Sequence, residues 1–342
     1  MSSITGTATD YNDFVAKLDA FLTTDAALVA AGQAWTLVWT SADTTQKIFK
    51  GPGLDGTAAV YVGRMLVTVP ASDSYVLQLR GFQDVVPGVA TWDEHVNPQP
   101  YGAAIYLDSN PMQYWISGNG RRFAMVVKIS TVYESAYCGL ILPYALPTNW
   151  PYPLVVVGTR GAQTIDVAPG GISTWRDGTG WHSGLMAPTE DLAGNGAARN
   201  NPSGMLLDPS GLWVSLTVSG PQLNSRHVTV FPIYPGQAQW GDIGFAGWNN
   251  SSDGLGQYAM WSIIRPGFDG SYPLIPLHLC TSTPNGLPPF ENELWGVFDG
   301  LSWVPGSGNG SENTVTVDGV THLVVQNCFR TTNTDYFTMA LE

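Results

Sequence analysis

Hydrophobic and polar residues alternate along much of this chain with a period of two, the spacing that is typical of a β-strand. The clearest run covers residues 122–130 and has one strongly apolar face. That face consists of Phe123, Met125, Val127 and Ile129. The following run, Tyr137 to Leu142, is apolar on both faces and stops at Pro143. We therefore expect a strand that is buried between two layers.

Similar short runs recur along the chain, separated by turn sequences rich in Gly, Pro, Asn and Asp. The other expected strands are residues 57–62, 64–69, 75–79, 103–108, 154–157, 212–218, 227–234, 258–264, 274–280, 296–298, 313–317, 322–327 and 335–341. A spacing near ten residues is typical of antiparallel sandwiches and barrels. The sequence therefore predicts a mainly β protein with antiparallel β-sandwich or barrel-like domains.

One segment near the start has helical spacing instead. Its apolar residues recur every three or four positions and are Tyr11, Phe14, Val15, Leu18, Phe21 and Leu22. Thr9 or Asp10 can cap this helix, and a second short helical piece, Asp25 to Ala31, should end at Gly32. We expect this helical segment to lead into a first strand that begins near Trp35.

Three regions follow from these patterns. Residues 1–48 form the N-terminal helical segment, and residues 49–160 form a β domain with a Pro-rich aromatic loop. Residues 161–342 form a β-rich region with long surface loops, whose last strands are expected to return to the main sheet. The internal boundary lies in residues 165–204, which are poor in strand signals and rich in Gly, Asn, Asp and Pro.

Charged residues make up only 12% of the chain and aromatic residues 11%, so the surface has few solvating charges. Such a chain either folds compactly or covers part of its surface with partners. The net charge of −13 argues against a nucleic-acid groove, which needs clustered Lys and Arg. The doublet Arg121–Arg122 is interpreted as a salt-bridged or solvated strand end, with a phosphate contact as the alternative.

Cys138, Cys280 and Cys328 lie far apart in apolar runs, which favours buried free thiols over a disulfide. The first ten residues lack the charge pattern of a secretion signal. No apolar run reaches the length of a membrane-spanning helix, so we expect no membrane insertion. These features suit a protein assembled in a reducing compartment.

The sequence offers no convincing chemistry. Residues 249–254 imitate the start of a calcium loop, but Met260 stands where a carboxylate is needed. The five histidines are not at metal-ligand spacing, and the carboxylate pairs Asp93–Glu94, Glu190–Asp191 and Glu291/Glu293 are interpreted as solvated surface. We therefore expect no catalytic, cofactor-binding or metal-binding residues and no enzymatic activity. Four tryptophans lie in Gly-rich loops, where they could anchor an interface or stack on a sugar; they are Trp175, Trp181, Trp240 and Trp248.

Residues 8–24, 30–35, 48–63, 114–159 and 312–342 resemble a family of tailed-bacteriophage virion structural proteins from the tail and baseplate region. The resemblance is thinnest between Ile165 and Pro289. It implies a non-enzymatic virion protein with no catalytic residue, located in the virion tail and assembled in the host cytoplasm. It also implies contacts with other phage virion proteins.

We expect such a subunit to act through protein–protein contacts in a symmetric assembly, as a trimer or in a three- or six-fold ring. The N-terminal helix and the Pro-rich aromatic loop are the expected contact elements. Their candidate interface residues are Tyr11, Phe14, Leu18, Tyr144, Trp150 and Tyr152. Two alternatives remain open: a receptor-binding module that recognises host surface polysaccharide through loop aromatics, and a polysaccharide-degrading enzyme.

Overall fold

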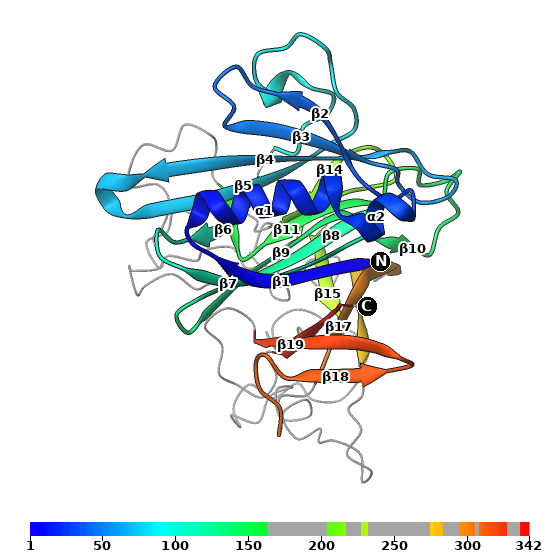
Figure 1. Cartoon of the computed structure of the whole chain (residues 1–342). Coiled ribbons are helices and arrows are strands. Elements are labelled where there is room, and N and C mark those ends of the chain that lie inside the picture. Colours follow the sequence, from blue (N-terminus) through cyan, green and yellow to red (C-terminus); the bar gives the residue numbers. More distant parts are fainter. Residues whose placement is uncertain are drawn as a thin grey trace, which may run out of the picture.

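The computed structural model describes residues 1–100, 102–162, 204–216, 227–231, 274–282, 294–304, 308–326 and 336–341. Three antiparallel β-sheets dominate these residues, with one longer helix near the N-terminus (Figure 1). The prediction of a mainly β, antiparallel fold with a short N-terminal helical segment is therefore confirmed. The strand expected at 258–264, the four loop tryptophans and, except for its last residue, the surface excursion at 165–204 lie outside the described residues.

The central sheet combines the first strand of the chain with strands from its middle. In spatial order it contains β1 (Ser2–Ala8), β7 (Met112–Gly118), β8 (Arg122–Ile129), β9 (Val132–Leu140), β11 (Leu154–Gly158), β13 (Gly204–Leu207) and β14 (Trp213–Ser215). Strand β1 was not expected, because residues 2–7 are mostly small and polar. It pairs along its whole length with β7, from Ser2 opposite Gly118 to Ala8 opposite Met112.

The N-terminal sheet is built mostly from one meander. In spatial order it contains β12 (Arg160–Ala162), β6 (Gly102–Leu107), β5 (Ser74–Phe82), β4 (Val60–Val69), β3 (Gln46–Gly51) and β2 (Thr36–Thr40). Two short 3-10 helices interrupt its connections, η1 (Pro70–Ser72) and η2 (Trp92–Glu94). Strands from residue 160 onward add to both of these sheets: β12 pairs with β6 in the N-terminal sheet, and β13 pairs with β11 in the central sheet. The predicted boundaries at residues 48 and 160 stay predictions.

The C-terminal sheet collects the strands described after residue 226. In spatial order it contains β15 (His227–Phe231), β16 (Ile275–Ser282), β17 (Leu294–Trp303), β20 (Tyr336–Ala340), β19 (Val320–Gln326) and β18 (Thr314–Val317). The last strand, β20, lies between β17 and β19, within this sheet. The short strand β10 (Leu142–Pro143) pairs with β17 and connects this sheet to the middle of the chain.

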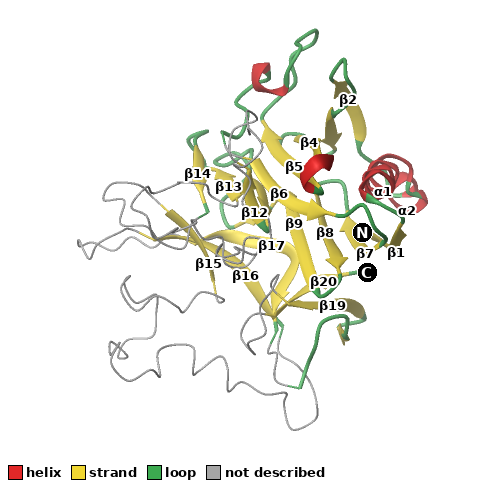
Figure 2. Cartoon of the chain, turned by 90° about the vertical axis from the view of Figure 1, so that its left-hand side faces the viewer, coloured by secondary structure: helices red, strands yellow, loops and turns green. Residues whose placement is uncertain are grey.

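The central sheet has apolar partners on both faces. One face, with Ile116 and Met125, packs with the N-terminal sheet in a first core cluster. The other face, with Trp115 and Val126, packs with the C-terminal sheet in a second cluster. Figures 1 and 2 show the resulting stack, with the central strands between the other two sheets. This arrangement explains why the predicted run from Tyr137 to Leu142 is apolar on both sides. The strand β9 ends at Leu140, however, and Leu142 pairs with β17 instead.

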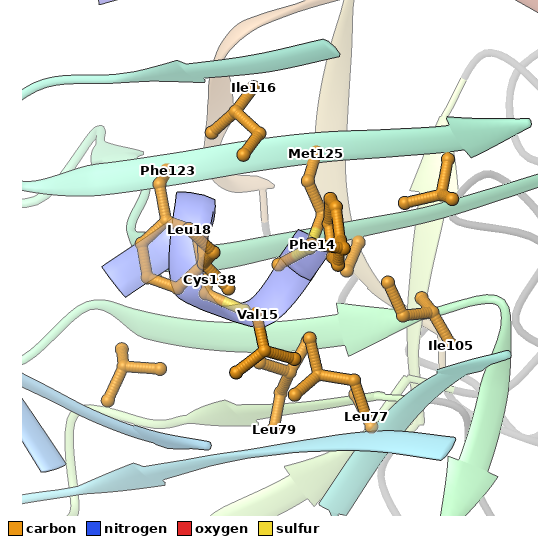
Figure 3. Close-up of a cluster of buried hydrophobic side chains, with 14 of the residues drawn as sticks. Phe14, Val15, Leu18, Leu77, Leu79, Ile105, Ile116, Phe123, Met125 and Cys138 are labelled. Carbon is orange, nitrogen blue, oxygen red and sulfur yellow. The ribbon is translucent and has the colours of Figure 1, made fainter. Parts of the chain in front are cut away.

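Helix α1 (Tyr11–Thr24) packs its apolar stripe against the first core cluster. Figure 3 shows Phe14, Val15 and Leu18 among side chains from both sheets of this sandwich. The Asp10 side chain caps the helix by accepting a hydrogen bond from the Asp13 amide at 2.9 Å. Helix α2 (Ala26–Ala30) follows, and Gly32 takes the expected left-handed conformation with φ of 65°.

The polar side of α1 is tied to the N-terminal sheet by charge. Asp19 accepts hydrogen bonds from Lys47 on β3 at 2.8 Å and from Arg64 on β4 at 2.6 Å. The helix is therefore fixed on both its apolar and its polar sides. Such a helix belongs to the domain core, which leaves little of it for a neighbouring subunit.

Candidate interaction surface

The structure separates the six candidate interface residues into three groups: buried, half-buried and exposed. Phe14 and Leu18 have no exposed surface and Trp150 is 1% exposed, so these three residues belong to the core of the chain itself. Their prediction as contact residues is wrong, because α1 and the aromatic loop use them to close the two sandwiches. Tyr11 is half-buried and stacks on Tyr75 with ring centroids 4.2 Å apart.

Trp150 anchors the Pro-rich loop in the core. Its indole Nε1 donates to the carbonyl of Leu207 at 2.9 Å, and its ring meets Trp295 edge to face at 5.5 Å. The amide of Trp150 also donates to the Leu146 carbonyl at 3.1 Å. Tyr152 is half-buried against the first core cluster. These buried contacts fix the backbone of the loop, and its exposed side chains project from that rigid backbone.

Tyr144 is the candidate residue that points outward. It is 56% exposed, and its amide donates to the carbonyl of Trp295 at 3.0 Å, which extends the pairing of β10 with β17. Its hydroxyl lies 2.8 Å from Nδ1 of His278 on β16, and the two rings are stacked with centroids 6.2 Å apart. Burial lowers the pKa of His278, so its imidazole is neutral at pH 7. The tyrosine ring is therefore exposed but fixed in orientation.

Two large apolar side chains are exposed on the same pair of segments. Leu146, two residues after Tyr144, is 67% exposed. Leu294, next to Trp295 on β17, is 58% exposed. We call Tyr144, Leu146 and Leu294 the Tyr144 surface. Exposed apolar side chains on a rigid frame lose little conformational entropy when a partner covers them, so this surface is suited to docking.

The Arg121–Arg122 doublet lies in a buried ion cluster. Arg122 has no exposed surface, and its Nε donates to Asp299 Oδ2 on β17 at 3.1 Å. The Nε of Arg121 donates to the same oxygen at 3.0 Å, and the side-chain Nδ2 of Asn119 does so at 2.9 Å. The salt-bridged interpretation of this doublet is confirmed. Arg122 also donates through Nη1 to the carbonyl and hydroxyl of Ser117, so its guanidinium is directed into the protein.

The electrostatics of this cluster follow from its geometry. The two guanidinium groups outweigh the effect of burial and hold the pKa of Asp299 at about 2, below its ordinary value of 3.8. The cluster joins the central sheet, through β8, to the C-terminal sheet, through β17. Sequence analysis missed Asp299 as the partner, because nothing in the text Asp299–Gly300 distinguishes it from an ordinary turn.

The described carboxylate pair, Asp93 and Glu94, takes structural roles. Asp93 pairs with Arg80, and Glu94 accepts from the amides of Ala90 and Thr91 at the start of η2. Among the described residues, no three His, Cys, Asp or Glu side chains lie close enough to hold a metal ion. Glu190, Asp191, Glu291 and Glu293 and the calcium-like loop lie outside those residues.

The Cys138 thiol is free and fully buried, as the sequence predicts. The side chain of Cys280 and the whole of Cys328 lie outside the described residues. Within the described part of the chain, no helix is long and apolar enough to cross a membrane.

No protein-family model matches the chain, and no curated protein matches it in sequence.

Proposed function

We propose that this chain is a non-enzymatic structural component of a bacteriophage virion, from the tail or baseplate, that acts through protein–protein contacts in a symmetric assembly. The observation that carries the proposal is the Tyr144 surface: Tyr144 and Leu146 are exposed on a loop anchored by buried Trp150, and Leu294 is exposed on β17. The proposal that the particle is a tailed bacteriophage rests on the sequence resemblance. The proposed partners are other virion proteins and further copies of this chain, in a trimer or a three- or six-fold ring assembled in the host cytoplasm.

The low charge of the chain supports a role in contact with proteins. With 12% charged residues, the chain has few solvating groups to keep an apolar surface isolated in solution. The layered fold supports the same role, because the central sheet is covered on both faces and gives the loop a rigid base. A pre-formed surface of this kind binds without a large ordering cost.

A reconstruction of the intact particle tests this proposal. We expect the chain to be found in the tail or baseplate, with Tyr144, Leu146 and Leu294 covered by a neighbouring protein. Substituting Tyr144→Ser and Leu294→Ser should lower incorporation into particles, while Leu212→Ser should not, because Leu212 is 66% exposed elsewhere in the chain. The proposal would be wrong if the chain were absent from particles or if the Tyr144 surface faced bulk solvent there.

The second candidate is a receptor-binding module for host surface polysaccharide. One observation favours it: the Tyr144 ring is exposed and held in place by the hydrogen bond of its hydroxyl with His278. A fixed aromatic face of this kind can stack on a sugar ring. Binding of the purified chain to glycans of the host surface, lost in Tyr144→Ala, would favour this candidate, and a chain that binds no glycan would remove it.

A further inference from the structure

We infer that the loop between β5 and β6, residues 83–100, is an acid-sensitive latch whose sensor is His95. The inference rests on how the imidazole is held and on what the loop covers. It concerns the N-terminal sheet, away from the Tyr144 surface, and does not depend on the proposed function.

His95 is 5% exposed and both of its ring nitrogens are constrained. Nδ1 accepts a hydrogen bond from the amide of Val86 at 3.1 Å, so this nitrogen has no proton in the folded protein. The proton of the neutral ring is therefore on Nε2, which is buried without a hydrogen-bond partner. A second proton could only enter at Nδ1, where it would face the N–H of Val86.

The surroundings of the imidazole are aromatic. Its centroid lies 4.8 Å from the ring of Trp39 on β2 and 5.8 Å from that of Phe82 on β5, in both cases nearly perpendicular. Trp92 and Phe82 complete the same small cluster with Ile48 and Met65. A charged imidazolium in this position would lose its hydration without gaining a hydrogen-bonded counter-ion.

The charged and titratable groups nearby are already engaged with other partners. In the loop, Glu94 acts to raise the pKa of His95, but its carboxylate accepts from two backbone amides. Asp93 pairs with Arg80 of β5. Asp84 accepts from the amide of Val85, and its charge acts on Tyr61 of β4. Burial dominates over Glu94 and lowers the pKa of His95 from its ordinary value of 6.5.

The direction of the pH effect follows from this lowered pKa. A histidine whose folded-state pKa lies below its unfolded value stabilises the closed loop above pH 6.5 and loses that contribution as the pH falls. Between the two pKa values, the opening equilibrium should rise by up to about tenfold per pH unit for one proton. Acid therefore favours release of the loop.

The loop covers parts of two sheets, so its release would expose apolar surface. Its Val89 carbonyl accepts from Trp39 Nε1 at 3.2 Å, at the edge strand of the N-terminal sheet. Its Asn97 carbonyl accepts from Trp213 Nε1 at 3.0 Å, at the edge strand of the central sheet. An opened loop would free both tryptophans, and Trp39 follows Leu37 and Val38 of β2, which are already exposed.

Hydrogen exchange of the Val86 amide, measured on the whole chain between pH 7.5 and pH 5, tests the latch. After correction for the intrinsic pH dependence of exchange, we expect its protection to fall by up to about tenfold per pH unit below about pH 6.5. The amide of Met125 in β8, which lies in the buried central sheet, should keep its protection over the same range. If the two amides responded alike, the inference would be overturned.

A variant separates titration from simple loss of a contact. His95→Asn places a non-titrating acceptor near Nδ1, so Val86 should stay protected at both pH values. His322→Asn is the matched control, since burial also lowers the pKa of His322 but it lies on β19 of the C-terminal sheet; it should leave the pH response unchanged.

If His95→Asn fails to fold, an NMR titration of the His95 ring in the wild-type protein replaces it. A pKa below 6.5 that coincides with the loss of Val86 protection supports the latch. A His95 pKa at or above 6.5 would refute it, as would a pH response that persists in folded His95→Asn.

Discussion

Arg122 of β8 and Asp299 of β17 form an ion pair, Nε to Oδ2 at 3.1 Å, between the central and C-terminal sheets. Arg122 is fully buried, and the same carboxylate oxygen also binds Arg121 and Asn119. A largely buried carboxylate shared by two arginines, such as Asp299 with its side chain 13% exposed, stabilises the fold only while all partners are present. Removing one partner leaves uncompensated charge. The stability of the contact between the central and C-terminal sheets therefore depends strongly on this pair.

Asp299→Asn should destabilise the protein strongly. The amide cannot balance two guanidinium groups, and the expected loss in free energy of unfolding is about 3–5 kcal/mol, measured by urea denaturation. Asp318→Asn is the control, because Asp318 is an exposed turn residue with φ of 51°, a conformation that asparagine tolerates. Equal stability of the two variants would contradict the role assigned to Asp299.

The same carboxylate should contribute to acid unfolding. Its folded pKa of about 2 lies below the ordinary value of 3.8, so its stabilising contribution is fully present above pH 3.8 and is lost as the pH falls through about 2. Over that window the wild-type protein should lose about 2 kcal/mol from this group. Equilibrium unfolding followed at a series of acidic pH values should show this loss, and Asp299→Asn should lack that component.

Gly300 allows the Arg122 guanidinium to approach the backbone. A Cβ at Gly300 would clash with Nη2 of Arg122, and its φ of 74° is in the left-handed region. Gly300→Ala should therefore cost both backbone strain, about 1–2 kcal/mol, and about 1.5–3 kcal/mol from displaced hydrogen bonds of Arg122.

Gly319→Ala separates these two contributions. Gly319 has a similar φ of 80°, but a Cβ there would meet nothing within 4 Å. Its substitution should cause only the backbone strain. Thermal unfolding of both variants measures the difference, and a Gly300→Ala variant no less stable than Gly319→Ala would show that Arg122 is not held where the structure places it.

The sequence predicts features that depend on neighbouring residues and misses those that depend on distant partners. The helix capped by Asp10 and the alternation of β8 are local patterns, and the structure has both. Strand β1 was missed because its small, polar residues become a strand only beside β7, about 110 positions later in the sequence, as the pairing of Ser2 with Gly118 shows.

The exposure of the candidate interface residues also depends on distant partners and could not be predicted from the sequence. Tyr144 and Trp150 lie in one Pro-rich loop and look equivalent in the sequence. They differ in burial because Trp150 contacts Trp295 and the Leu207 carbonyl, whereas Tyr144 follows the last residue of β10 that pairs with β17 and is exposed to solvent. The pairing of Arg122 with Asp299, 177 positions apart, is likewise a product of how the sheets stack.

The Cys138 thiol should be unreactive in the native protein. It has no exposed surface, and burial raises its pKa well above the ordinary value, so the thiolate needed for alkylation is scarce. Cys138 lies in β9, within the central sheet, where access requires unfolding of the core. With a typical free energy of unfolding of about 5 kcal/mol or more, alkylation by iodoacetamide at mildly alkaline pH should be at least about 10³-fold slower than in denaturant.

Peptide mapping by mass spectrometry can follow Cys138 separately from Cys280 and Cys328, because trypsin leaves Cys138 on one peptide and the other two cysteines together on another. Asp299→Asn provides the matched comparison. Since it lowers the free energy of unfolding without touching Cys138, it should accelerate alkylation of Cys138 by the same factor by which it raises the unfolding equilibrium constant, provided that opening and closing are fast relative to the reaction. Rapid alkylation of Cys138 in the stable wild-type protein would show that the central sheet is not covered on the face where Cys138 packs.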